Sequence, residues 1–107
     1  MEINKIQLID CLTGLRLVES EGINLIVTSP PYNIGKAYEK RAPIQIYLDW
    51  QKELIAEYFR VLSPSGSLVY QVGNFIDNGK VYPLDCLLFS YFIVDILHLR
   101  CKFRNEF

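Results

Sequence analysis

Two spacings of hydrophobic and polar residues alternate along the chain. Residues 24–28 carry apolar side chains on both sides, which is typical of a central parallel strand covered on both faces. From residue 48 to residue 62 the apolar positions recur every three or four residues, which predicts an amphipathic helix. Residues 67–72 form the next predicted strand. This alternation is the main indication of how the chain folds.

Weaker patterns complete the order of elements. Residues 5–9 and 97–103 are predicted as a first and a last strand, and residues 12–19 and 82–93 as helices. A long loop is expected over residues 33–47, a turn over 63–66 and a polar loop over 77–79. Strands that alternate with helices indicate an α/β fold, with a mostly parallel sheet and flanking helices.

Polar clusters follow three of the predicted strands. They are Asp10-Cys11, the segment 29–32 and Gly73-Asn74. In open parallel sheets, ligands bind beyond the carboxyl ends of the strands. The sequence therefore predicts a site at this edge of the sheet.

The segment Ser29-Pro30-Pro31-Tyr32 carries the clearest chemistry. The prolines stiffen the loop and hold each preceding residue extended. The Pro30 carbonyl and the Ser29 hydroxyl then offer two acceptors for an amine, and Tyr32 offers a ring on which a flipped base can stack. The alternative is a proline turn that ends a strand and packs an aromatic ring.

The residues Thr-Ser-Pro-Pro-Tyr-Asn at 28–33 resemble the catalytic motif of the DNA amino-methyltransferases, which act on adenine N6 or cytosine N4. Residues 9–12, 48–50, 59–68 and 104–106 are similar to further segments of that family. The resemblance implies a Rossmann-like methyltransferase fold, S-adenosylmethionine as cofactor and double-stranded DNA as partner. Serine at position 29 favours cytosine over adenine.

The resemblance also implies that Asp10 and Cys11 contact the adenine end of the cofactor. Asp10 has a second interpretation as the N-cap of the helix that follows it. The two roles are compatible. For Cys11 the alternative is simple packing, and the residue pattern favours it.

Contacts with DNA would come from local clusters, because the net charge of the 107 residues is only −1. Lys36, Lys40 and Arg41 could meet phosphates, or could form a solvated loop. Asn74 could line the base pocket, or could be a turn residue. The cysteines form no close pair and His98 is the only histidine, so we expect no metal site.

The length suits one small domain, and the composition, 50% hydrophobic and 21% charged, suits a packed core. The first ten residues lack the apolar run of a signal peptide. Acidic residues interrupt the apolar stretch 84–99, which argues against a membrane span. We expect a cytoplasmic protein.

One signature of the resembled family is missing. The chain has no Phe-x-Gly-x-Gly turn, which forms the cofactor site in that family. In its circularly permuted members the catalytic half comes first. Residues 1–107 are therefore expected to be a single incomplete domain, without the cofactor glycine motif or a target-recognition domain. Such a chain should self-associate or pair with a complementary cofactor-binding half. The alternatives are a non-catalytic remnant and methylation of RNA or protein.

Overall fold

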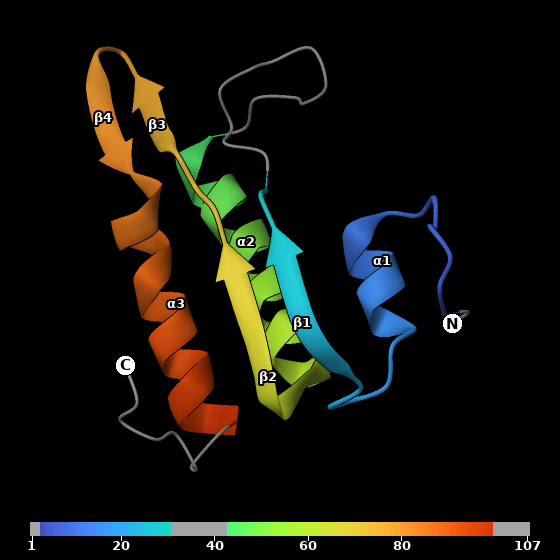
Figure 1. Ribbon diagram of the computed structural model, residues 1–107. Helices are drawn as coiled ribbons and strands as arrows, with labels where there is room; N and C mark the ends of the chain where they lie inside the picture. The colour runs from blue at the N-terminus through green and yellow to red at the C-terminus, as the bar shows by residue number, and fades with distance from the viewer. Residues whose placement is uncertain (1–2, 31–42, 100–107) are drawn as a thin grey trace.

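The computed structural model describes residues 3–30 and 43–99. Within these ranges the elements follow one another as α1 (Cys11–Arg16), β1 (Ile23–Thr28), α2 (Ile44–Val61), β2 (Leu62–Tyr70), β3 (Asn74–Asp77), β4 (Lys80–Pro83) and α3 (Leu84–Leu99) (Figure 1). The central unit is β1–α2–β2, in which two parallel strands are joined by a long helix. The expected α/β fold with a parallel sheet and flanking helices is confirmed.

The parallel pairing of β1 with β2 aligns the ends of both strands. Thr28 lies opposite Tyr70, and the pairing runs back regularly to Leu25 opposite Ser67. Between Leu25 and Ile23 the pairing register shifts, because Ile23 lies opposite Leu62. Residues 63–66 therefore bulge out of β2, at the place where the sequence predicted a turn. At Gly66 an added Cβ would lie 2.7 Å from Leu62 Cδ1, so any larger residue in this bulge would have to displace the Leu62 side chain.

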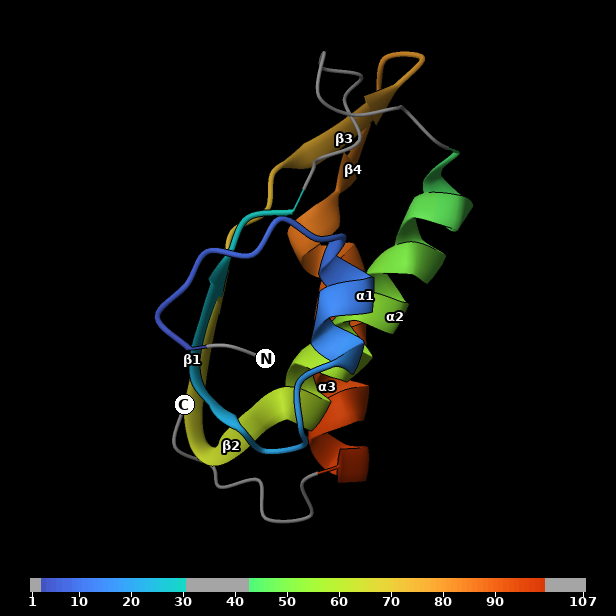
Figure 2. The ribbon, with the colours of Figure 1, turned by 90° about the vertical axis from the view of Figure 1, so that its right-hand side faces the viewer.

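The three helices lie on the same side of the two-stranded sheet (Figure 2). Helix α2 packs against both α1 and α3, and its apolar face provides most of the core. Because side chains of a strand alternate between its faces, Ile26 of β1 and Leu68 of β2 reach this core. The buried residues of the core come from α2, the β3–β4 hairpin and α3: Tyr47, Leu54, Ile55, Tyr58, Phe59, Phe75, Leu84 and Leu88.

The opposite face of the sheet is apolar and has no cover from the described part of the chain (Figure 2). Leu25 and Val27 of β1 are 61% and 68% exposed, and Val69 of β2 is 52% exposed. Val27 and Val69 lie opposite each other in the pairing. We call these three residues the outer face.

Arg60 of α2 hydrogen bonds both to α1 and to the segment that leads into β1. Its Nη2 donates to the Leu15 carbonyl at 2.8 Å, and its Nε pairs with Glu57 at 3.0 Å. Its carbonyl accepts from the Glu21 backbone N–H at 2.9 Å. One residue on α2 thus holds the segment between α1 and β1 in place.

The first strand predicted from the sequence, over residues 5–9, is wrong. Residues 3–9 form no strand and are exposed, with Ile6 at 98% and Leu8 at 106% of their reference areas. A strand must hydrogen bond to a neighbouring strand, and the described residues place none beside this segment. An apolar pattern alone could not reveal that its partner is missing.

A hairpin replaces the polar loop that was expected over residues 77–79. Strands β3 and β4 pair antiparallel, with Asp77 opposite Lys80. Asn78 and Gly79 between them have φ of 50° and 74°. Asn-Gly is the preferred pair for a two-residue turn with both φ values positive, so the sequence did contain this signal.

All three helices differ from their predicted ranges. Helix α1 ends at Arg16, so the helix expected over 12–19 is wrong for residues 17–19. Helix α2 begins at Ile44, so the expected loop over 33–47 is wrong for residues 44–47. Helix α3 continues to Leu99, so residues 97–99 are helical where a last strand was expected, and residues 100–103 lie outside the described range. Residues 84–99 are apolar on nearly all sides, which gives no periodicity to distinguish helix from strand. None of the described helices combines the length and apolar character that spanning a membrane requires.

Candidate active site

The candidate motif begins where two parallel strands end together. Thr28 and Tyr70 are the last residues of β1 and β2 and lie opposite each other. The backbone N–H of Gln71 donates to the Thr28 carbonyl at 3.0 Å. Ser29 and Pro30 follow directly, and Ser29 is exposed while Pro30 is buried. The start of the motif is thus anchored at the sheet edge where the sequence predicted a site.

The rest of the motif, Pro31 and Tyr32, lies outside the described residues, as do the basic residues Lys36, Lys40 and Arg41. Their predicted roles, in holding the base and in meeting phosphates, stay predictions.

Asp10 is the N-cap of α1, as one of its two interpretations predicted. Its Oδ2 accepts from the backbone N–H and from the Oγ1 of Thr13, both at 3.0 Å. These hydrogen bonds, first of all that from the Thr13 backbone, lower the pKa of the Asp10 carboxyl below its ordinary value. The carboxyl is therefore ionised at neutral pH.

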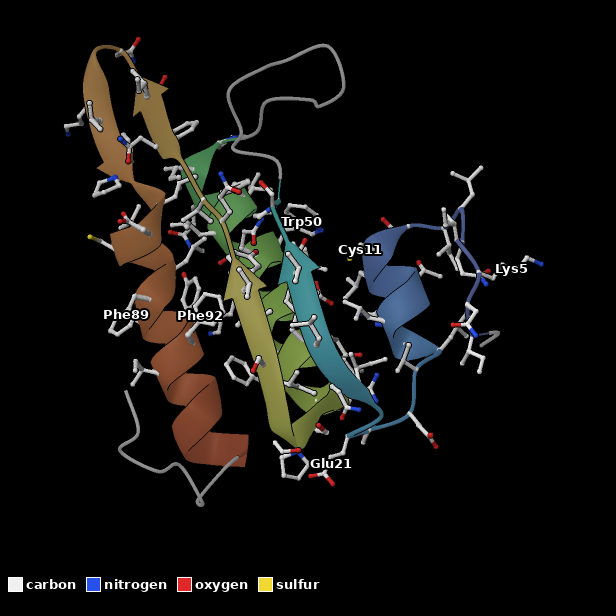
Figure 3. The ribbon with its side chains drawn as sticks, in the orientation of Figure 1. Lys5, Cys11, Glu21, Trp50, Phe89 and Phe92 are labelled. Atoms are coloured by element: carbon white, nitrogen blue, oxygen red, sulfur yellow. The ribbon has the colours of Figure 1, made fainter. Side chains whose placement is uncertain are left out.

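Cys11 connects the start of α1 to α2. Its Sγ lies 3.5 Å from Tyr58 Oη on α2. Cys11 is exposed rather than packed, and Figure 3 shows it at the beginning of α1. Burial raises the pKa of the Tyr58 phenol well above its ordinary value, so this hydroxyl stays protonated.

Two residues beneath the strand ends, Tyr70 and Gln51, were not predicted from the sequence as part of the site. The Tyr70 hydroxyl donates to Gln51 Oε1, and Gln51 is fully buried on α2. A signal was present, because Gln51 falls on the apolar face of the predicted helix, between Tyr47 and Leu54. A polar residue at such a position generally has a hydrogen-bond partner.

Asn74 is the first residue of β3 and lies four positions after the end of β2. It is exposed and stands opposite Pro83 of β4. A role in lining a base pocket stays a prediction.

Asp10 fits a contact with an adenine amine. A carboxylate has about four lone-pair positions for hydrogen bonds, and this one is exposed while it caps the helix. Neither β1 nor β2 is followed by the glycine turn that holds the rest of such a cofactor. The described residues therefore suit one end of S-adenosylmethionine only.

Replacing Asp10 with alanine should fray α1, whereas serine should preserve it, because serine also caps helices. Asp10→Ala removes both bonds from Thr13, so the Thr13 amide should exchange faster with solvent. In the unaltered chain, the lowered pKa of Asp10 means that the cap stabilises α1 above pH 3.8 and is lost as the pH falls through the folded-state pKa. Amide exchange at neutral and acid pH tests both expectations. Equal Thr13 exchange in the alanine and serine variants would contradict the capping role.

Comparison of the sequence with known proteins gives relatives of one kind. Residues 23–107 match the model of a family described as DNA methylase. The chain is 44% identical over 91 residues to the type II methyltransferase M.BglII of Bacillus subtilis, covering 84% of this chain and 25% of that protein. It is 35% identical over 80 residues to the DNA adenine methyltransferase YhdJ of Escherichia coli K12, covering 72% and 26%. The chain spans about a quarter of the length of these relatives.

Solved structures agree with the sequence comparison. TTHA0409 of Thermus thermophilus, assigned as a DNA modification methylase, superposes on 80% of this chain and 35% of its own length, with a TM-score of 0.65 and 28% identity. Its complex with S-adenosyl-L-methionine superposes on 85% of this chain and 38% of its own length, with a TM-score of 0.58 and 30% identity. S-adenosylmethionine is thus the cofactor that these comparisons support. The chain belongs to the DNA methylase family, the N6 and N4 amino-methyltransferases that the Ser-Pro-Pro-Tyr motif resembles.

Proposed function

We propose that this chain is the catalytic half of a DNA methyltransferase that methylates the exocyclic amine of cytosine or adenine. The observation that carries the proposal is the position of Ser29 and Pro30, directly after a parallel strand whose end is aligned with that of its neighbour. Serine at this position favours cytosine N4. YhdJ is named as an adenine enzyme, so both bases belong in the test.

The Ser29 hydroxyl and the Pro30 carbonyl act as paired acceptors for the target amine. They orient the lone pair of the nitrogen along the line of attack, and such placement supplies much of the rate in a transfer of this kind. S-adenosylmethionine supplies an electrophilic methyl group on a sulfonium. The nitrogen lone pair forms the N–C bond while the C–S bond breaks with its electron pair going to sulfur. The nitrogen then releases a proton to water.

A complementary cofactor-binding half completes the site. The outer face of Leu25, Val27 and Val69 supports this part of the proposal, because a parallel sheet is normally covered on both faces. The exposed apolar residues Ile6 and Leu8 support it as well. The described residues pair β1 along one edge only, with β2, and an open edge of this kind accepts a further strand.

The isolated chain should bind S-adenosylmethionine weakly and transfer no methyl group. Mixed with the part of the M.BglII relative that this chain does not match, it should methylate DNA. Transfer of label from S-adenosylmethionine to DNA measures this, with RNA and protein acceptors run beside it. Micromolar binding by the chain alone, about −8 kcal/mol, would contradict the idea of a separate cofactor half.

A pair of variants tests whether the outer face is the contact. Val27→Lys should prevent complementation, because it puts a charge on an apolar surface that becomes covered. Val81→Lys is the matched control, since Val81 is also exposed, at 55%, but lies on the β3–β4 hairpin. Methyl transfer to RNA or protein in preference to DNA would favour those substrates. A mixture that methylates none of the three would favour a non-catalytic remnant.

A further inference from the structure

Polar contacts from α2 lie beneath the end of the β1–β2 sheet. The Oη of Tyr58 on α2 lies 3.5 Å from Cys11 Sγ. Tyr70, the last residue of β2, donates its hydroxyl proton to Gln51 Oε1 of the same helix. The end of β2 is therefore tied to α2 by a hydrogen bond at the level from which the motif leaves the sheet.

The stability of the fold does not explain why a glutamine occupies position 51. Its side chain is fully buried, and its Nε2 has no hydrogen-bond partner among the described residues. A buried donor without a partner is unfavourable, whereas replacing both members of a buried pair by apolar groups of the same shape can be neutral or stabilising. An apolar side chain would therefore serve the core at least as well.

The bond between Tyr70 and Gln51 does supply direction, which apolar packing does not. The Tyr70 ring is already packed edge-on, with ring centroids 5.1 Å from Phe92 and 5.9 Å from Tyr58; Figure 3 labels Phe92 on α3. These contacts hold the ring in its plane. The hydrogen bond from the Tyr70 hydroxyl to Gln51 then fixes where the ring lies along α2. Burial raises the pKa of the Tyr70 phenol far above its ordinary value, so the donor keeps its proton.

We propose that Gln51 and Tyr70 are positioning residues for the candidate active site, setting where Ser29 stands relative to α2. The path is short: Tyr70 lies opposite Thr28, the Gln71 N–H holds the Thr28 carbonyl at 3.0 Å, and Ser29 is the next residue. The catalytic consequence rests on the function proposed above. The geometric consequence, a displaced Ser29, belongs to the chain itself.

The test compares Gln51→Met, Tyr70→Phe and the double variant. Each single change leaves one buried polar group without its partner and should lower the unfolding temperature. The double change removes both groups and should restore it. In the complemented enzyme, kcat of the double variant should still be about tenfold lower, with KM for DNA within about twofold, because small misplacements of reacting groups slow the chemical step. Restored kcat together with restored stability would mean that the pair is only structural, and would overturn the proposal.

A measurement without turnover separates this proposal from the proposed function. In the isolated chain, the backbone amide of Gln71, which donates to the Thr28 carbonyl, should exchange about tenfold faster in the double variant, because the strand end loses its tie to α2, while that of Ile26 should keep its rate. An unchanged Gln71 amide would overturn the positioning role whether or not the complemented enzyme is active. Gln45→Met is the matched control, since Gln45 is an exposed glutamine on the same helix that donates to Asp49 at 2.9 Å. Gln45→Met should change neither kcat of the complemented enzyme nor amide exchange at the strand end.

Discussion

Replacing Ser29 with alanine should slow methyl transfer by about a hundredfold in the complemented enzyme, with little effect on DNA binding. The reason is that one acceptor for the target amine is lost in the transition state, and a well-placed polar contact of this kind is worth about 2.7–4 kcal/mol. Ser29 is exposed and lies outside the buried core, so the fold should not suffer. Single-turnover methylation measures the rate, and a DNA-binding titration measures the affinity.

Variants of Tyr32 serve as comparison in the same experiment. Tyr32→Ala removes the proposed stacking face, worth about 1–3 kcal/mol for a base, and should weaken capture of the flipped base. Tyr32→Phe retains the ring and should act nearly normally. Fluorescence of 2-aminopurine at the target position reports the capture. Near-normal rates for both Ser29→Ala and Tyr32→Ala would exclude a catalytic role for this motif.

Replacing Ile55 with alanine should cost about 2–5 kcal/mol of unfolding free energy, because it leaves a cavity in a packed core. Ile55 is fully buried in the core cluster and lies on α2, the helix that contacts α1, α3 and β2. Small domains have total stabilities of about 5–15 kcal/mol, so this single change should remove a large share of the free energy of unfolding. Urea unfolding followed by circular dichroism measures the loss.

Ile46→Ala is the matched control, because Ile46 is the same residue type on the same helix but is 60% exposed. Its change should stay within about 0.5 kcal/mol. Equal losses for Ile46→Ala and Ile55→Ala would mean that the apolar face of α2 is not packed as described.

The uncovered sheet face and the missing glycine turn are both explained if the chain corresponds to only one part of its relatives. The chain spans about a quarter of its relatives, yet it contains a complete β1–α2–β2 unit with a buried core on one side of the sheet. The motif leaves from this unit at Ser29. The strand end from which the motif leaves can therefore be formed locally, and under the proposed function cofactor binding depends on the part that covers the outer face.

Strong periodic patterns were read correctly from the sequence. The predicted strand at residues 24–28 became β1 (Ile23–Thr28), and the predicted helix at 48–62 became the larger part of α2 (Ile44–Val61). The family was also correctly identified from the residues at 28–33, because two adjacent prolines after a buried strand and before an aromatic are an uncommon combination. The roles of Asp10, Cys11 and Asn74 in binding stay predictions, as do those of the motif residues.

By itself, the sequence determined the α/β class, the central helix, the position of Ser29 at a strand end and the family. These follow from local spacing and from side-chain chemistry that neighbours in the chain already specify. Only the tertiary structure decided that residues 5–9 form no strand, because strand formation depends on a partner that no local pattern reveals. It also decided that Tyr70 and Gln51 meet, 19 residues apart, under the motif. Such contacts depend on how β2 lies against α2, and side-chain spacing within either element does not determine that.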